Sequence, residues 1–243
     1  MVTTVIVMLS VSVLEAEVRS SDSYRLESDS INFGGGLSAS DNYRQESTLG
    51  EVATGESASP SFSLRAGYQQ MQTVYVSVAV ASSSLTLSPA LGGLSGGVSS
   101  GSTTITVLTD SPSGYELTIE ASASPAMQAG SETIADYVPT ASPAPDLSFL
   151  TASGDVHFGF AVYGSDVVAR YRNNGGLCDV GSSSTPETCW DGLSTTPRAI
   201  ARGGANQPNG AVTEVYFQVG IGGSTAVLPG TYIATTTVTA LPL

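Results

Sequence analysis

The amino-acid sequence predicts an all-β protein: an antiparallel, immunoglobulin-like β-sandwich preceded by an extension that is a repeat or β-meander. Three observations support this fold class. Apolar and polar residues alternate with a period of two in several segments after residue 72, turn-forming residues separate these segments, and no long amphipathic helix is apparent.

The alternation identifies the expected strands one by one. Valines occupy every second position in TVYVSVAVA, and TTITVLTD, YELTIEA and VTEVYFQVG follow the same rule, while TYIATTTVTA is rich in threonine on one side. The segments DSPSG, NNGG, QPNG and LPG supply turn residues between them. Residues 72–243 are therefore expected to form a sandwich of seven or eight strands with long connections.

The first 16 residues allow two interpretations. The apolar run from Val2 to Leu14 is too short for a transmembrane helix. Its length fits a signal peptide, although it has no basic n-region and Leu14 is a mediocre match for a cleavage site ending at Ala16. Because Val, Ile and Thr favour strands, residues 1–16 are either a leader or a donor strand that enters the sheet of a neighbouring subunit. The assembly strand would use Val2, Val5, Val7, Leu9, Val11 and Val13.

Residues 17–71 contain a repeat. Tyr24, Tyr43 and Phe62 are spaced by 19 residues, and Arg, Glu, Ser and Gly residues recur around them. Each unit can hold two short strands and two turns, but the repeat stops short of the three full units that a solenoid needs. We predict an extension that folds against the sandwich or a neighbouring chain, with these three aromatic residues at its interface.

The charge balance limits the partners. The chain has 21 acidic residues, eight arginines and no lysine, for a formal net charge of -13. Nucleic acids and anionic membrane surfaces both need clustered cations, so neither is an expected partner. Only 12% of the residues are charged, and the abundance of Ser, Thr and Gly is common in secreted surface proteins. No membrane span is expected in the mature form.

The two cysteines, Cys178 and Cys189, lie close together in a Gly-, Ser- and Pro-containing segment. A zinc site would need further ligands, and the one histidine, His157, is distant in sequence. We predict a disulfide that staples a surface loop, worth roughly 3 kcal/mol from loop-closure entropy. Such a bond implies an oxidising compartment. The alternative is a pair of reduced, inert thiols.

Two long connections, residues 121–155 and 170–207, are candidates for function because long loops in compact domains often carry it. Trp190 follows Cys189, and we interpret it as a cover over the disulfide, with ligand stacking as the alternative. If the loops bind a glycan, the expected contacts are Trp190, Tyr163 and Tyr171, since aromatic faces stack on sugars.

No motif indicates catalysis. GLSGG at Gly93–Gly97 matches G-x-S-x-G, but it lies between strands and not between a strand and a helix. LPGTY resembles a sortase signal only in part, and we predict a turn into the last strand. His157 is expected to be a strand residue with a satisfied ring, and the acidic residues of the repeat match no calcium-loop spacing. We therefore predict no enzymatic activity, no catalytic residues, no cofactor and no metal site.

Three stretches carry a resemblance. The repeat around SDNYRQE that leads to LRAGYQQM, the stretch TDSPSGYELTIEA and the closing PGTYIATTTVTA resemble segments of uncharacterised secreted bacterial surface proteins with pilus-like or spore-coat-like β-sandwich domains. The resemblance covers most of the chain. It implies export and a structural or adhesive role, and it carries over no catalytic residue.

These observations predict a secreted structural protein, a subunit of an extracellular filament or cell-surface layer. The subunits would form a homopolymer by β-strand complementation, in which a strand of one copy completes the sheet of the next. The alternative is a monomeric adhesin or glycan-binding module of the cell surface, with a surface glycan as its partner.

Overall fold

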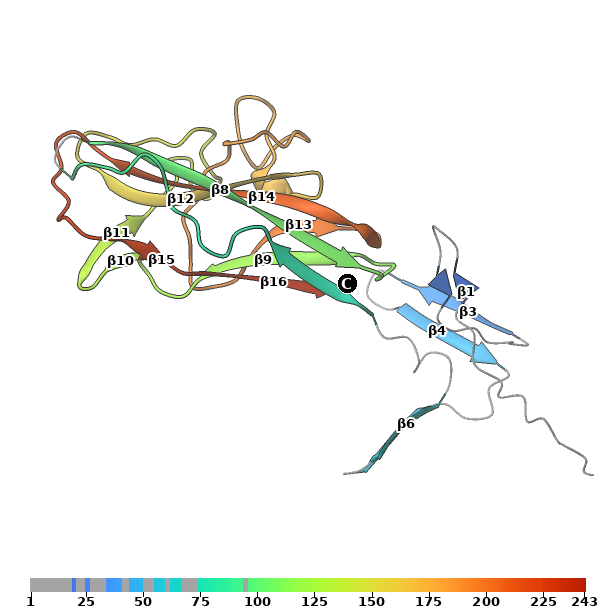
Figure 1. The fold of residues 1–243 in the computed structure, drawn as a ribbon. Coiled ribbons are helices and arrows are strands. Elements are labelled where there is room, and N and C mark those ends of the chain that lie inside the picture. Colours follow the sequence, from blue (N-terminus) through green and yellow to red (C-terminus); the bar gives the residue numbers. More distant parts are fainter. Residues whose placement is uncertain are drawn as a thin grey trace, which may run out of the picture. The chain divides into compact units, whose positions relative to one another are not determined.

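The computed structural model describes residues 19–20, 25–26, 34–40, 44–49, 55–59, 62–66, 74–93 and 96–243. The chain divides into two compact units, Met1–Thr73 and Val74–Leu243. The described elements are strands, apart from the short 3₁₀ helix η1 (Ala169–Tyr171), so the predicted all-β class is confirmed (Figure 1).

The first unit contains antiparallel hairpins. They pair β1 (Arg19–Ser20) with β2 (Arg25–Leu26), β3 (Gly34–Ala39) with β4 (Arg44–Leu49), and β5 (Gly55–Ser59) with β6 (Phe62–Ala66). The described strands pair only within their own hairpin, so the described part of the repeat forms separate two-stranded ribbons and not the continuous meander that the sequence analysis considered. A 19-residue unit is long enough to complete one hairpin, which explains why one hairpin corresponds to each repeat.

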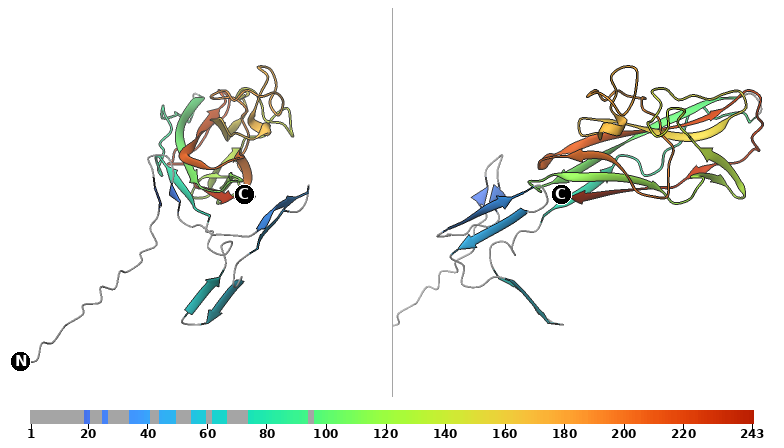
Figure 2. Two further views of the ribbon diagram at one scale, coloured as in Figure 1. Left: turned by 90° about the vertical axis from the view of Figure 1, so that its right-hand side faces the viewer. Right: turned by 180° about the vertical axis from the view of Figure 1, so that it is seen from behind.

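The second unit contains two sheets. Its strands are β7 (Val76–Val80), β8 (Gly97–Thr109), β9 (Tyr115–Ala121), β10 (Met127–Ala129), β11 (Glu132–Asp136), β12 (Val156–Gly164), β13 (Arg198–Gly203), β14 (Gln207–Ile221), β15 (Ile233–Ala234) and β16 (Thr236–Pro242). The large sheet has the order β15-β10-β11-β12-β14-β8-β7, and the small sheet has the order β13-β9-β16. Figure 2 shows these layers from two further directions.

The large sheet is mixed. β11 and β12 run parallel, with Ala135 opposite His157 and Asp136 opposite Phe158. A purely antiparallel sandwich was expected, and this pair departs from it. Parallel neighbours need a long crossover connection, and residues 137–155 provide one between these two strands.

The main core lies where the two sheets face each other. In β9, the alternating residues Tyr115, Leu117 and Ile119 are 0%, 0% and 2% exposed, as the period-two pattern predicts. In β14, Val215, Phe217 and Val219 are buried in the same way. Side chains of both sheets belong to this one cluster, and each fully buried apolar side chain stabilises the fold by about 1.5–3 kcal/mol.

A second, smaller cluster covers the outer face of the large sheet. Ala161 of β12 and Tyr216 of β14 are direct cross-strand neighbours, and they lie on the face opposite to the main core. Tyr137 and Trp190, from the two long connections, pack against this position. Near β12 and β14, the connection before β12 is drawn in yellow-green and the one after it in yellow to orange (Figure 1).

Candidate functional site

The outermost strand of the large sheet, β7, has an open edge. Among the described residues its only strand partner is β8. The outermost strand of the small sheet on the same side is β16, and Cα atoms of β7 and β16 approach within 8 Å. No ladder of hydrogen bonds joins these two strands in the described part of the chain. The two sheets are therefore not closed onto each other here.

Two valines of β7 face the core but are only partly covered. Val78 lies opposite Val107, and Val80 lies opposite Ile105. Direct cross-strand neighbours share a face of the sheet. Val107 and Ile105 are 0% and 1% exposed, yet their partners Val78 and Val80 remain 37% and 40% exposed. Val76, on the same face, is partly buried against the main core, so the core-facing side of β7 is covered at Val76 and only in part at Val78 and Val80.

More exposed apolar residues gather around the turn that joins β8 to β9. The backbone of Tyr75 bonds to Asp110, with Tyr75 N donating to Oδ1 over 2.6 Å. At the same turn Leu243 N donates to Gly114 O over 2.9 Å. Together with β7, these residues form what we call the edge patch: Val74, Tyr75, Val78, Val80, Leu241 and Leu243, all exposed. Val78 and Val80 lie on the core-facing side of β7, whereas Leu241 lies opposite Glu116 on the outer face of the small sheet, so the edge patch is a group of exposed apolar residues near one edge and not one continuous surface.

The edge patch can accept a strand. An unpaired edge presents a row of backbone N–H and C=O groups, which readily pair with another chain. An added strand would satisfy those groups, and its alternate side chains could cover Val78 and Val80. Sequence alternation located β7, but it could not show that Val78 and Val80 on its core-facing side remain partly exposed.

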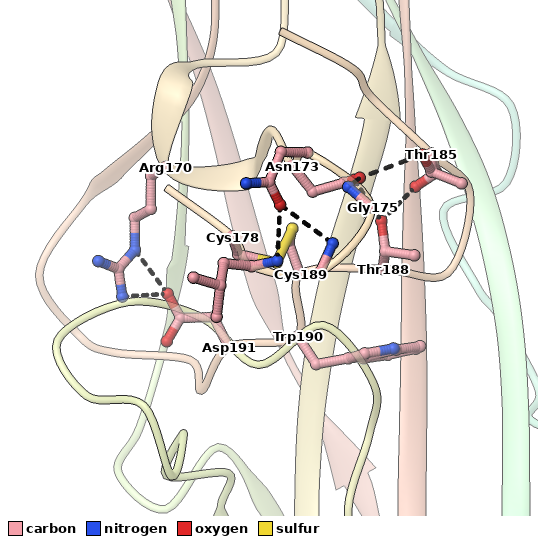
Figure 3. The surroundings of a disulfide bond; sticks show 12 residues. Arg170, Asn173, Gly175, Cys178, Thr185, Thr188, Cys189, Trp190 and Asp191 are labelled. Carbon is pink, nitrogen blue, oxygen red and sulfur yellow. Dashed lines mark hydrogen bonds and ion pairs between the residues drawn. A yellow bond between two sulfur atoms is a disulfide. The ribbon is translucent and has the colours of Figure 1, made fainter. Parts of the chain in front are cut away.

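The predicted disulfide is confirmed. Cys178 and Cys189 are bonded over 2.05 Å, and both are buried (Figure 3). The loop is organised by Asn173, which is 3% exposed and donates from Nδ2 to the hydroxyls of Thr185 and Thr188. The loop is therefore held by a covalent bond and by a buried amide whose hydrogen bonds are satisfied.

Trp190 is a packing residue. It is 2% exposed, its indole Nε1 donates to Glu187 O over 2.9 Å, and its ring meets Phe149 edge to face with centroids 5.1 Å apart. Its packing partners are Tyr137, Ala161 and Phe149, whereas both cysteines belong to the main core, so the interpretation of Trp190 as a cover over the disulfide stays a prediction. The alternative of ligand stacking does not agree with this burial, because the ring has no exposed face.

The other two aromatic candidates differ from each other. Tyr171 is 0% exposed, which leaves no surface for a sugar to contact, whereas Tyr163 is 38% exposed. Tyr163 lies in one cross-strand row with Glu214 and Thr104. These three residues line a shallow depression of about 430 Å³. The structure therefore does not bring Trp190, Tyr163 and Tyr171 together as one binding surface.

A charged cluster lies beside Trp190, and no sequence pattern predicted it. The Asp191 carboxylate is buried, and its Oδ2 accepts from Arg170 Nε over 2.8 Å and Nη2 over 2.7 Å (Figure 3). Arg198 Nη1 donates to the same oxygen over 2.5 Å, and Tyr171 OH donates to it over 3.3 Å. Burial lowers the pKa of Arg198, but the Asp191 charge, the neighbouring Tyr171 and the hydrogen bonds to both residues together raise the pKa above its ordinary value. Arg198 therefore stays charged.

Other buried polar groups have structural roles. His157 lies in β12, its Nε2 is 3.1 Å from Thr151 Oγ1, and its ring packs edge-on against Tyr137 and Phe149, so the prediction of a satisfied strand histidine is confirmed. Burial lowers its pKa. Asp146 accepts from Tyr137 OH over 2.6 Å and holds the connection that leads to β12.

The remaining sequence predictions concern the N-terminal unit. The assembly strand Val2, Val5, Val7, Leu9, Val11 and Val13 lies outside the described residues, as do Tyr24 and Tyr43. Phe62 begins β6 and pairs with Ser59 across the hairpin.

Within the described ranges, no group of three or more His, Cys, Asp or Glu side chains is placed to hold a metal ion. Nor does that part of the chain contain a helix long and apolar enough to cross a membrane.

Comparisons of the chain with protein-family models, curated proteins and solved structures give no match. The resemblance to bacterial surface proteins therefore stays a hypothesis. The described residues define a β domain of two sheets with an internal disulfide and an unpaired edge at β7, and its function has to be argued from that geometry.

Proposed function

We propose that this protein is a secreted structural subunit of an extracellular filament or cell-surface layer, and that it assembles by β-strand complementation. The observation that supports this most directly is the edge of β7, where Val78 and Val80 face the core and remain 37% and 40% exposed. An edge that is both unpaired and apolar is what an incoming strand requires.

The proposed donor is the segment Val2–Val13 of a neighbouring copy. Apolar residues recur at every second position in its central part, at Val5, Val7, Leu9, Val11 and Val13. An extended strand with this pattern would direct all five side chains to one face. Paired with β7, that face would cover the two core-facing valines and extend the large sheet by one strand.

Secretion is part of the proposal. The disulfide between Cys178 and Cys189 is compatible with an oxidising, extracellular environment, where such bonds form and persist. The net charge of -13 favours solubility and mutual repulsion between copies. Association would therefore depend on specific strand pairing and not on non-specific contacts.

The finer fold assignment, an immunoglobulin-like sandwich, is also a proposal. Two sheets that share one core support it, and the parallel β11–β12 pair is a departure from it. A crystal structure would decide the matter: two sheets packed face to face with their strands within about 30° of each other keep the assignment. A single closed barrel would reject it.

The decisive test of assembly is deletion of residues 1–16 from the full chain. We expect the full chain to form regular filaments or sheets in electron micrographs and the deleted chain to remain monomeric in sedimentation. Normal polymers after deletion would rule out the donor assignment. Monomers from both chains would rule out the polymer.

A pair of point variants tests the acceptor edge. Val78→Lys places a charge on the core-facing side of β7 and should abolish polymers, since charged edge residues block strand addition. Val212→Lys is the matched control, because Val212 is also an exposed strand valine, at 51%, but lies on β14 inside the sheet. Equal loss in both variants would mean that β7 is not the acceptor.

A monomeric glycan-binding module is the second candidate function. Its support is the depression beside Tyr163, where an exposed aromatic ring adjoins the Glu214 carboxylate and the Thr104 hydroxyl. On a glycan array, Tyr163→Ala should lose binding that the parent chain shows. An array without hits for the parent chain would reject this candidate.

A further inference from the structure

Cations are scarce in this chain, and two of them meet at one place. Residues 74–243 contain four arginines and no lysine. Arg170, from η1, and Arg198, from β13, converge on the buried carboxylate of Asp191. Two of the four arginines in residues 74–243 therefore share one carboxylate.

Asp191 holds both guanidinium groups in place without using all their donors. Arg170 binds it through Nε and Nη2, and its Nη1 has no hydrogen-bond acceptor among the described residues. Arg198 uses Nη1 for both Asp191 and the carbonyl of Gly192. The two side chains remain 27% and 34% exposed, so donors are fixed in orientation and accessible from outside.

Both arginines line a depression of about 470 Å³. Val138, Pro139, Pro143 and Leu193 give it apolar walls, and Ser142 and Asp136 also line it. Asp136 accepts from Ala126 N over 3.0 Å. Burial is the largest influence on the Asp136 carboxyl and raises its pKa.

The charges in the depression select the ligand. Two guanidinium groups share the single Asp191 carboxylate, which leaves an excess positive charge on their side. Arginine donors in a planar fork suit a carboxylate. Asp136 would repel a second negative charge, but it can accept a hydrogen bond from a hydroxyl group. The combination fits a singly charged, hydroxylated acid better than a phosphate.

We propose that this depression binds a hydroxylated carboxylate of the sugar-acid class, such as a uronic acid. Its carboxylate would bind to Arg170 and Arg198, and a hydroxyl would donate to Asp136. Asp191 is a positioning residue: it fixes the two guanidinium groups before the ligand arrives, which reduces the entropy lost on binding.

This site is separate from the proposed assembly site. None of its lining residues belongs to the edge patch or to the depression beside Tyr163. Failure of strand complementation and failure of sugar-acid binding are therefore distinguishable experimentally.

The test is calorimetric titration of the full chain with glucuronate and galacturonate, with glucose and galactose as uncharged counterparts. We expect the acids to bind and the neutral sugars not to. Arg198→Gln should weaken binding by at least about 10-fold, the effect of losing a charged hydrogen bond. Arg202→Gln is the matched control, since Arg202 also lies in β13 but is 60% exposed and points to Glu116; it should leave binding unchanged.

Three outcomes would contradict the proposal. Neutral sugars could bind as tightly as the acids, neither acid could give a heat of binding, or Arg198→Gln and Arg202→Gln could weaken acid binding by the same factor. If circular dichroism shows that Arg198→Gln is unfolded, Arg170→Lys decides, because it keeps the charge but removes the planar fork; unchanged binding in that variant contradicts the proposal. A second titration, with an oligouronate, distinguishes a free acid from a polysaccharide end as the natural source.

Discussion

The connection between β12 and β13 and the edge of β7 lie on the same domain and differ in almost every respect. The connection has a disulfide, the buried Asn173, and a carboxylate that binds two arginines, and it covers the outer face of the large sheet with Trp190. The edge has none of these interactions in the described residues, and its valines are exposed although they face the core.

This difference separates a part of the domain whose polar groups are paired from a strand whose outer backbone groups have no partner among the described strands. An irregular connection needs side-chain hydrogen bonds and cross-links because it has no strand ladder of its own. A strand edge has an unused ladder, which another strand can complete. The β12–β13 connection and the outer sheet face that it covers, which we call the closed side, therefore add to the stability that the main core gives the domain, and the edge of β7 is the acceptor in the proposed assembly.

Trp190 provides the largest test of the closed side. Trp190→Ala should lower the free energy of unfolding by about 3–5 kcal/mol, because a large buried ring leaves a cavity. Tyr75→Ala, at the edge patch, should change it by less than about 0.5 kcal/mol, since Tyr75 is 59% exposed. Urea unfolding measures both. Similar costs at the two positions would remove the contrast between the regions.

The disulfide should be the next largest contributor. Replacing Cys178 and Cys189 together by Ser should lower the free energy of unfolding by about 3 kcal/mol, because the unfolded chain regains the entropy that the cross-link removes. A reducing agent should lower the stability of the parent chain by a similar amount and leave the double variant unaffected. An unchanged unfolding midpoint in the double variant would contradict a stabilising role.

His157 should make the closed side sensitive to mild acid. Burial lowers its pKa below the ordinary value of 6.5, so the unfolded chain binds the proton more tightly than the folded chain does. Stability is therefore full above pH 6.5 and should decline as the pH falls through the folded pKa. His157→Gln should reduce this dependence between pH 7 and pH 5 in denaturant titrations. An identical slope in parent and variant would exclude His157 as the cause.

The smallest expected effect compares the two members of one cross-strand pair. Val107→Thr buries a hydroxyl in the main core and should cost about 1–3 kcal/mol. Val78→Thr, directly opposite, should cost less than about 1 kcal/mol, since that side chain is already 37% exposed. In assembled protein the cost at Val78 should rise toward that at Val107. The same small cost in monomer and polymer would argue against β7 as the buried acceptor.

Local patterns predicted much of the fold. Alternation located β9 and most of β14 and the faces that they bury. A strand that packs one face on a core has apolar residues at every second position, and this pattern is visible in its own sequence. The short, turn-rich separation of the cysteines similarly predicted their bond. The same rule gave an incomplete answer for β7, because alternation reports which face a side chain joins and not whether another layer covers that face.

The candidate sites were less predictable. Tyr163, Tyr171 and Trp190 looked equivalent in sequence, yet two are buried and one is exposed. Arg170, Asp191 and Arg198 come from separate segments, and no spacing rule joins them. The parallel β11–β12 pair was missed for a related reason, since strand direction depends on how residues 137–155 cross the sheet.

The sequence by itself determined the all-β class, the disulfide and the alternating parts of the long strands, because each depends on residues close together in the chain; it placed QPNG in a turn, whereas these residues begin β14. Only the tertiary structure decided which valines stay partly exposed, which aromatic rings are buried and which arginines share a carboxylate. Those features depend on contacts between residues far apart in sequence, and a contact of that kind exists only after the sheets have packed.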